Sequence, residues 1–319
     1  MERRPDFLLV GAPKAGTTAL HAALAQHPDV FTTTPKEPKY WLCDDAPPPA
    51  WRGPGDKHSQ QEWVWRRDDY ERLFEAAAPH QVRGESTPFY LWSRSAHRRI
   101  AEELPGVRLV AVVRDPIDRA YSNWMHLWCD GLEPEGDFER TIGLQEQRVR
   151  DGWAPFWRYV ELGRYGAQLA HLYRHVDRDR VLLLRYRDLV DDPTGAVDRT
   201  CRFLGIREGQ VGSVPQDNSR SFVTPGWRPA LLGPAVRTGA RLGQFGPPRL
   251  WRRASAPLTA ALRGPRVVHR PRLDPAVRER LLPQFAEDVD LLCRVTGQDF
   301  SDWLSTADRG SFRERSAAD

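Results

Sequence analysis

The residues best suited to chemistry lie near the start of the chain, in the stretch FLLVGAPKAGTTAL that begins at Phe7. Its apolar residues predict a short buried strand over 7–10, and the pattern after Gly16 predicts a helix over 17–26. A helix start favours an anion, because its first amides have no acceptor one turn earlier and the helix dipole is positive there. The stretch therefore predicts a phosphate-binding loop. Its expected contacts are Lys14, Ala15, Gly16, Thr17, Thr18 and Ala19.

The position of the lysine in this loop differs from that in the P-loop of nucleotide triphosphatases. That P-loop reads GxxxxGK[ST], with the lysine directly after the second glycine. Here Gly11 and Gly16 keep the glycine spacing, but Thr17 occupies the lysine position and the loop carries Lys14 instead. An ammonium at this place lies on the crown of the loop, beside the far end of a bound phosphate chain.

A second candidate segment follows the apolar run 108–113, which predicts a buried parallel strand. Arg114 comes directly after it, at the end of the strand where open α/β sheets bind ligands. Asp115 and Pro116 form the expected start of the next helix, and Ser122 falls about two turns into that helix. A guanidinium with a hydroxyl suits a phosphate monoester, because the planar fork donates two parallel bonds.

Together the two segments resemble the donor-binding motifs of the sulfotransferases that use 3′-phosphoadenosine-5′-phosphosulfate (PAPS). PKxGTTxL, from Pro13, resembles the 5′-phosphosulfate loop, and RDPxxRxxS, from Arg114, resembles the 3′-phosphate-binding segment. The similarity covers about residues 5–210 and 274–304, and its end is similar to the last helix of bacterial members. It implies PAPS as co-substrate. No metal is required, since lysine and backbone dipoles can stabilise the leaving oxygen, and Lys14 is the expected catalytic lysine.

Glu37 is the expected base for an acceptor hydroxyl. It lies 23 residues after Lys14, where the saccharide sulfotransferases of the family place their catalytic glutamate. A second interpretation stays open, because TPKE from Thr34 also has the pattern of a helix-capping box with proline at its first position. Phenol-type members use a histidine, for which His58 and His126 are the stand-ins considered.

We therefore expect a sulfotransferase that moves a sulfuryl group from PAPS by in-line displacement to a hydroxyl of a small-molecule, saccharide or lipid-linked acceptor. Twelve tryptophans form either an aromatic platform for that acceptor or part of the core. Two other functions are weighed against it. A Mg²⁺-dependent nucleotide kinase with a degenerate P-loop would need the lysine that position 17 lacks, and a nucleic-acid binder would carry a base-reading motif, which the sequence does not resemble.

The expected architecture is α/β: a P-loop-like three-layer fold with a central parallel sheet flanked by helices on both faces. All 319 residues are expected to form a single domain. Residues 44–60 are rich in proline and glycine and predict an irregular loop. The remaining expected strands are 29–32, 82–85 and 181–185, and the remaining expected helices are 94–104, 116–128, 164–175, 195–204 and 274–296.

The segment 220–273 is expected to be an arginine-rich cap or insertion. It holds eleven arginines and no acidic residue, more positive charge than the whole chain's net +4. It is either a solvated cap or a surface that attracts an anionic donor, an acidic acceptor or a lipid membrane. Apolar residues such as Val236 between the arginines fit an amphipathic helix, which Gly233 and Pro234 interrupt.

Composition points to a cytoplasmic protein. Residues 1–6 lead directly into the first strand, which leaves no room for a signal peptide. The four cysteines are widely scattered without CxxC spacing, which argues against a disulfide framework or a structural metal and fits a reducing compartment.

Overall fold

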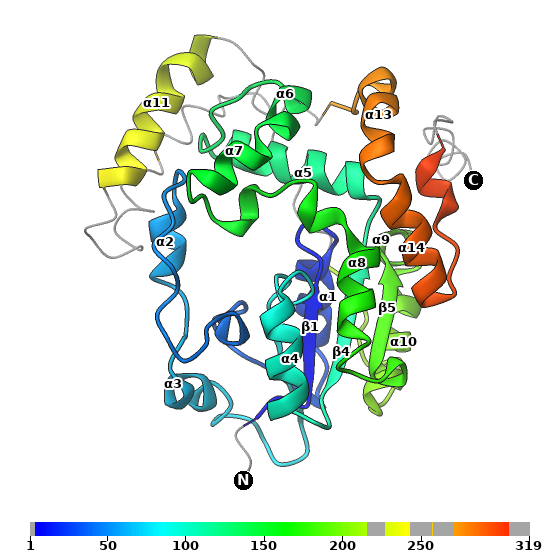
Figure 1. Ribbon diagram of the computed structural model, residues 1–319. Helices are drawn as coiled ribbons and strands as arrows, with labels where there is room; N and C mark the ends of the chain where they lie inside the picture. The colour runs from blue at the N-terminus through cyan, green and yellow to red at the C-terminus, as the bar shows by residue number, and fades with distance from the viewer. Residues whose placement is uncertain (1–3, 216–226, 243–256, 258–270, 306–319) are drawn as a thin grey trace.

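A five-stranded parallel sheet forms the centre of the protein, as the computed structural model shows (Figure 1). The structure describes residues 4–215, 227–242, 257 and 271–305. The strands are β1 (Phe7–Gly11), β2 (Val30–Thr32), β3 (Val82–Ser86), β4 (Arg108–Val113) and β5 (Val181–Arg185). Their order is β2-β3-β1-β4-β5, and every neighbouring pair is parallel. The expected α/β fold and its strands are confirmed.

The centre of the sheet is buried on both sides, because β1, β4 and β5 are almost continuously apolar. Phe7 pairs with Gly84 of β3, and a Cβ at Gly84 would lie 2.1 Å from the Phe7 ring. Only glycine lets this aromatic ring lie flat over the neighbouring strand. The match fixes the register of β1 against β3.

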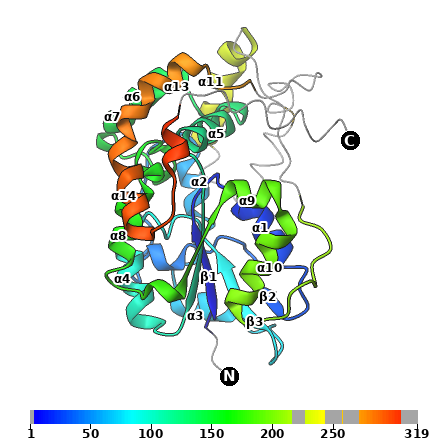
Figure 2. The same ribbon diagram turned by 90° about the vertical axis from the view of Figure 1, so that its right-hand side faces the viewer.

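Helices cover both faces of the sheet, as Figure 2 shows. On one face lie α1 (Thr17–Leu24), α9 (Tyr186–Asp191) and α10 (Pro193–Leu204); on the other lie α4 (Arg94–Glu103), α8 (Tyr165–Leu172) and α14 (Ala286–Thr296). This confirms the three-layer arrangement. The helix expected over 195–204 begins two residues earlier, because Asp192 accepts a hydrogen bond from Gly195 N and Pro193 takes the first helical position.

Further helices lie beyond the carboxyl ends of the strands (Figure 1). They are α5 (Pro116–Cys129), α6 (Phe138–Gly143), α7 (Gln145–Arg150) and α13 (Pro275–Leu281). The segment between β2 and β3 contains two short helices, α2 (Asp56–Gln60) and α3 (Arg67–Arg72), and the 3₁₀ turn η1 (Tyr40–Leu42). The remaining 3₁₀ turns are η2 (Pro155–Trp157), η3 (Glu161–Gly163), η4 (Arg178–Arg180), η6 (Leu282–Gln284) and η7 (Ser301–Leu304).

Two expected elements differ in detail. The helix predicted over 274–296 is divided into α13, η6 and α14, because Pro283 has no N–H with which to continue a regular helix. The loop predicted over 44–60 contains the five-residue α2. This turn forms because the buried Asp56 carboxylate accepts from Gly53 N at 2.8 Å, which closes the turn at the start of α2.

The arginine-rich segment is described only in part. Residues 227–242 form α11 (Trp227–Leu242), which continues through Pro234 rather than being interrupted there. Val236 is buried, and Arg237 donates to the carbonyl of Gly131 at 3.4 Å. Most of the rest of the expected cap lies outside the described residues. Among the described residues, no helix has both the length and the apolar character needed to cross a bilayer.

Candidate functional site

The candidate site lies at the carboxyl ends of the strands, and each strand delivers residues to it. Lys14 follows β1, Glu37 follows β2, Thr87 follows β3, Arg114 follows β4 and Tyr186 follows β5. Because parallel strands end on one edge of the sheet, residues far apart in sequence are collected there. The loop after β1 is central, since β1 lies between β3 and β4.

The loop after β1 has the backbone of an anion cradle. Lys14 and Gly16 both adopt left-handed conformations, with φ of 67° and 92°. At Gly16 a side chain is also excluded by space, because a Cβ there would lie 2.9 Å from the ring of Tyr186. A non-glycine residue in this region is uncommon, and such residues gather at ligand sites. The position of the Lys14 side chain on the crown of the loop stays a prediction.

Two of the loop's amides bond within the chain. Ala15 N donates to Ala12 O at 3.1 Å, and Ala19 N donates to Gly16 O at the same distance. Thr17 and Thr18 begin α1, so their amides have no acceptor one turn earlier. Thr17 is buried and Thr18 is exposed. The expected phosphate contacts from this loop stay a prediction, for which the amides of Thr17 and Thr18 are the best placed.

Arg114 reaches the loop from the neighbouring strand. Its guanidinium donates to the carbonyl of Lys14 at 3.5 Å and lies 4.6 Å from the ring centroid of Tyr186. The hydrogen bond is long, and guanidinium carries five N–H donors, so donors remain for a phosphate. Ser122 is buried two turns into α5. The two predicted donor-binding segments therefore meet, while a bond from Ser122 to the donor stays a prediction.

The start of α5 is fixed by Asp115, as expected. Its carboxylate accepts from Ile117 N at 3.0 Å and Asp118 N at 3.1 Å, and Pro116 takes the first helical position. The same carboxylate pairs with Arg278 of α13, which also lies 3.1 Å from Asp118. The C-terminal part of the chain thus stabilises the residue next to Arg114.

Glu37 lies near the loop after β1 and the first turn of α1. Lys36 connects them, because its Nζ donates to Thr18 Oγ1 at 2.9 Å and lies 3.4 Å from Glu37 Oε1. The interpretation of Thr34 to Glu37 as a helix-capping box is wrong, since the chain bends at 34–36 and runs on without a helix until η1. The segment is held instead by the sheet, because Ser86 N at the end of β3 donates to Lys36 O at 3.2 Å.

A histidine that sequence analysis did not single out lies in this neighbourhood. His21, one turn into α1, shares a 2.8 Å hydrogen bond with Ser86 Oγ. Burial and the Lys36 ammonium lower the pKa of His21 to about 4, so the ring is neutral at physiological pH. His126 lies 3.8 Å from Asp130 and packs edge-on against Phe156, away from the loop, and the side chain of His58 lies outside the described residues.

Below the site lies Glu85, a fully buried carboxyl on β3. Thr87 Oγ1 donates to it at 2.9 Å and Tyr70 Oη at 3.4 Å. Burial raises the pKa of Glu85 to about 8, more than these hydrogen bonds lower it. Thr87 also accepts from Lys39 N at 3.2 Å, which connects this network to the segment after Glu37. Keeping Glu85 protonated avoids a second negative charge beneath Glu37.

The side chain of Lys39 lies near an aromatic pair. Its Nζ is 5.4 Å from the ring centroid of Trp63, and that ring lies 5.0 Å from the ring of Trp51. Burial lowers the pKa of Lys39, although the carboxylates of Glu37 and Glu62 favour its charged form. Both tryptophans are only partly buried, unlike the core residues Trp41, Trp124, Trp157 and Trp303.

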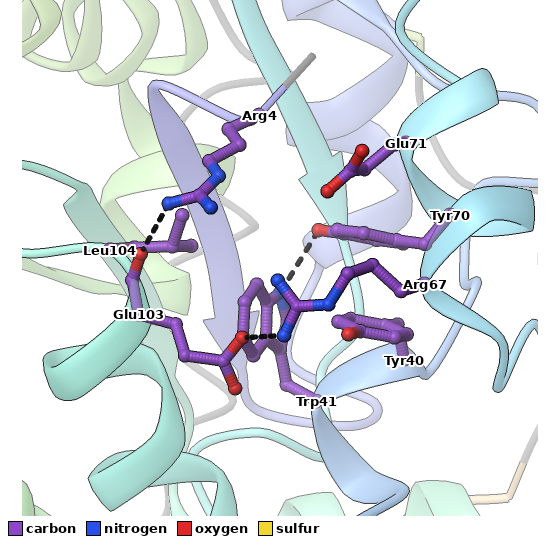
Figure 3. A pocket seen from close by; sticks show the side chains of 8 residues that line it. All are labelled: Arg4, Tyr40, Trp41, Arg67, Tyr70, Glu71, Glu103 and Leu104. Carbon is purple, nitrogen blue, oxygen red and sulfur yellow. Dashed lines mark hydrogen bonds and ion pairs between the residues drawn. The ribbon is translucent and has the colours of Figure 1, made fainter. Parts of the chain in front are cut away.

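A small pocket at the other end of the sheet does not belong to this site (Figure 3). Arg4 and Leu104 line it, and they precede β1 and β4 at the amino ends of the strands. Arg67 pairs with Glu103 across it at 2.5 Å, and Trp41 Nε1 donates to Tyr70 Oη at 3.0 Å, as Figure 3 shows. Arg4 also donates to the carbonyl of Glu103 at 3.1 Å, so several of the pocket's polar groups are engaged with one another.

The fold defines an α/β protein of the P-loop-like class. A sequence model of the sulfotransferase family matches residues 5–208, and the chain belongs to this family. It is 31% identical over 211 residues to human heparan sulfate glucosamine 3-O-sulfotransferase 6. The matched residues cover 64% of this chain and 53% of that protein. Human heparan sulfate glucosamine 3-O-sulfotransferase 3B1 is 29% identical over 212 residues, covering 64% and 46%.

The chain spans about half the length of these curated relatives. A crystal structure of a sulfotransferase from Alicyclobacillus acidocaldarius matches with a TM-score of 0.73 and 27% identity, covering 95% of this chain and 99% of that one. The fold therefore extends beyond the family match, into the C-terminal helices.

Proposed function

We propose that this protein is a PAPS-dependent sulfotransferase that acts on an acceptor hydroxyl. One observation carries the proposal: the Arg114 guanidinium lies 3.5 Å from the carbonyl of Lys14, so the two predicted donor-binding motifs lie next to each other. Lys14, Thr17 and Thr18 would bind the phosphosulfate end, and Arg114 with Ser122 would bind the 3′-phosphate. Membership of the sulfotransferase family supports this assignment.

Within that site, Lys14 would stabilise the bridging oxygen as it gains negative charge, and Glu37 would accept the proton of the acceptor hydroxyl. The donor supplies an activated sulfuryl group. In the transfer step the acceptor oxygen bonds to sulfur, the bond from sulfur to the bridging oxygen breaks, and adenosine 3′,5′-bisphosphate leaves. The proton moves to Glu37, whose carboxylate is about one-third exposed and so accessible to an acceptor.

For the acceptor we propose a saccharide hydroxyl as the first class to test, with small-molecule and lipid-linked alcohols as alternatives. Support comes from the saccharide substrate in the names of the matched relatives and from the partly buried Trp51 and Trp63 near the base. Aromatic faces commonly bind the apolar faces of sugar rings. We also propose that residues 1–319 form one domain and that the protein is cytoplasmic.

The donor assignment can be tested without knowing the acceptor. Adenosine 3′,5′-bisphosphate at one hundred times its Kd should stabilise the folded protein by about 2.7 kcal/mol, because only the folded state binds it. The measurement is the melting temperature with and without ligand, with adenosine 5′-monophosphate as the control lacking a 3′-phosphate. Equal shifts with both ligands would contradict a 3′-phosphate site at Arg114, and no shift with either would contradict the proposed function. A screen of acceptors with labelled PAPS then identifies the substrate.

A further inference from the structure

Lys36 connects two parts of the site that belong to different elements. Its ammonium donates to Thr18 Oγ1 at 2.9 Å, in the first turn of α1, and lies 3.4 Å from Glu37 Oε1, after β2. The first contact reaches the donor loop and the second reaches the candidate base. A single side chain therefore spans the gap between the donor side and the acceptor side of the site.

The backbone holds Lys36 in the orientation that this contact needs. Consecutive residues of an extended chain point to opposite faces, so neighbouring side chains normally do not meet. Here the bend at 34–36 brings Lys36 and Glu37 to the same side, and Ser86 N fixes the bend by donating to Lys36 O. About a quarter of the Lys36 side chain is exposed, so it faces the accessible side of the loop rather than the core.

The charges explain why the site needs such a link. The phosphosulfate group is anionic, and an ionised Glu37 beside it would be repelled by the donor. An ammonium bonded to both sides offsets that repulsion. The same charge acts on His21, whose pKa it helps to lower, so the neighbouring imidazole adds no second cation. Lys39 is the other ammonium near Glu37, but it lies over Trp63 and next to Glu62.

We propose that Lys36 is a positioning residue for the transfer reaction. It holds the Glu37 carboxylate against the first turn of α1 and offsets its charge beside the anionic donor. The inference rests on the proposed function and adds to it a residue that acts through the base. Lys14 differs from Lys36 in this respect, because its proposed role is on the donor itself.

The test is a double-mutant cycle of Lys36→Met and Glu37→Gln, with Lys36→Arg as the conservative variant. Turnover is measured with labelled PAPS and the acceptor from the screen, and binding of adenosine 3′,5′-bisphosphate is measured by calorimetry. We expect Lys36→Met to lower kcat about tenfold or more, within the range of a general base's contribution. Affinity for adenosine 3′,5′-bisphosphate should fall by much less than kcat, through the repulsion that Lys36 no longer offsets, and the melting temperature should stay nearly unchanged. Lys36→Arg should keep most of the activity, and Lys36→Met should have little further effect when Glu37 is already glutamine.

Three outcomes would overturn the proposal. One is wild-type turnover in Lys36→Met. Another is an equal loss from Lys36→Met in both backgrounds, which would mean that Lys36 acts independently of Glu37. The third is a matching tenfold loss of bisphosphate binding, which would make Lys36 a donor ligand. Failure of the underlying function is recognised separately. The unmutated protein would then not bind adenosine 3′,5′-bisphosphate. If Glu37→Gln alone kept full activity, Glu37 would not be the base.

Discussion

At the scale of single residues, the site combines partly buried charges with one fully buried acid beneath them. Glu85 is fully buried and its pKa is raised to about 8, because desolvation disfavours the charged carboxylate. In the unfolded chain the same group would have a pKa near its ordinary value of about 4.3. The folded protein therefore holds a proton at neutral pH that the unfolded chain releases.

This difference predicts a pH dependence of stability. Between about pH 4.5 and pH 8 the folded state binds more protons at Glu85, so the free energy of unfolding falls as pH rises through this window, by at most about 1.4 kcal/mol per pH unit. Glu85→Gln cannot titrate and should flatten that decline. The measurement is urea unfolding at pH 5 and pH 8 for both proteins.

Glu102→Gln provides the matched control, because Glu102 is exposed on α4. It should keep the wild-type pH dependence. If Glu85→Gln shows the same decline as wild type, Glu85 does not cause the pH dependence, and the inference that it is protonated in the folded protein is wrong.

At the scale of elements, α13 stabilises the start of α5. Arg278 bonds the buried Asp115 carboxylate and the carbonyl of Trp303, so it joins the segment after β4 to the C-terminal turn η7. Asp115 is 4% exposed as a side chain and Arg278 12%. Removing one partner of such a buried pair is costly, because the remaining charge keeps its desolvation penalty.

We therefore expect Arg278→Met to lower the free energy of unfolding by about 3 kcal/mol and to weaken binding of adenosine 3′,5′-bisphosphate. The second effect follows because Asp115, once deprived of Arg278, competes for the neighbouring Arg114. Denaturant unfolding and calorimetry measure the two effects. Arg280→Met on the same helix is the control, since its pair with Glu139 is solvent-exposed and should matter little. Equal effects of the two variants would show that the Arg278 pair has no special role.

The elements differ in how far the sequence predicts them. Strands such as β4 were predictable because a parallel strand buried on both faces must be continuously apolar. The motif after β1 was predictable because its glycine has a conformational reason, visible at Gly16. The short helix α2 was not, since it forms through Asp56, which accepts from Ala154 N, 98 residues away, at 2.8 Å.

The site shows the same division. Lys14 and Arg114 could be named from local patterns, because each follows a predicted strand, whereas Glu37 was named from the family resemblance. The link through Lys36, the position of His21 and the ring of Tyr186 beneath Arg114 depend on which strands lie side by side. Local sequence does not give the order of the strands in the sheet, so these contacts could not be predicted from it.

At the scale of the whole molecule, the positive charge is concentrated in one segment of the chain. The net charge of +4 and the pI of about 9.0 come from the arginines of 220–273, so the remainder of the chain is acidic. The described part of that segment, α11, packs through Val236 and Arg237 near the end of α5. We expect its positive potential to raise the rate of donor association, with an effect that falls at high salt.

The C-terminal helices are integrated into the fold that carries the donor site. Asp288 of α14 accepts from Gly166 N at 2.8 Å and from Ala167 N at 2.9 Å, at the start of α8. Phe285 and Leu292 are buried in the same core as β4. Because these contacts join the C-terminal helices to α8 and to the core around the sheet, we expect one cooperative unfolding transition rather than separate domains.

Far-ultraviolet circular dichroism and tryptophan fluorescence should therefore give coincident melting curves, and the calorimetric enthalpy should equal the van't Hoff enthalpy. Adenosine 3′,5′-bisphosphate should move both curves together, although its site lies near the N-terminal motif. Asp288→Ala should lower the same single transition, because it removes the acceptor of two amides at the start of α8. Should Asp288→Ala instead split the melting curve into a ligand-sensitive and a ligand-insensitive step, the C-terminal helices would form a separate unit, and the single-domain proposal would be wrong.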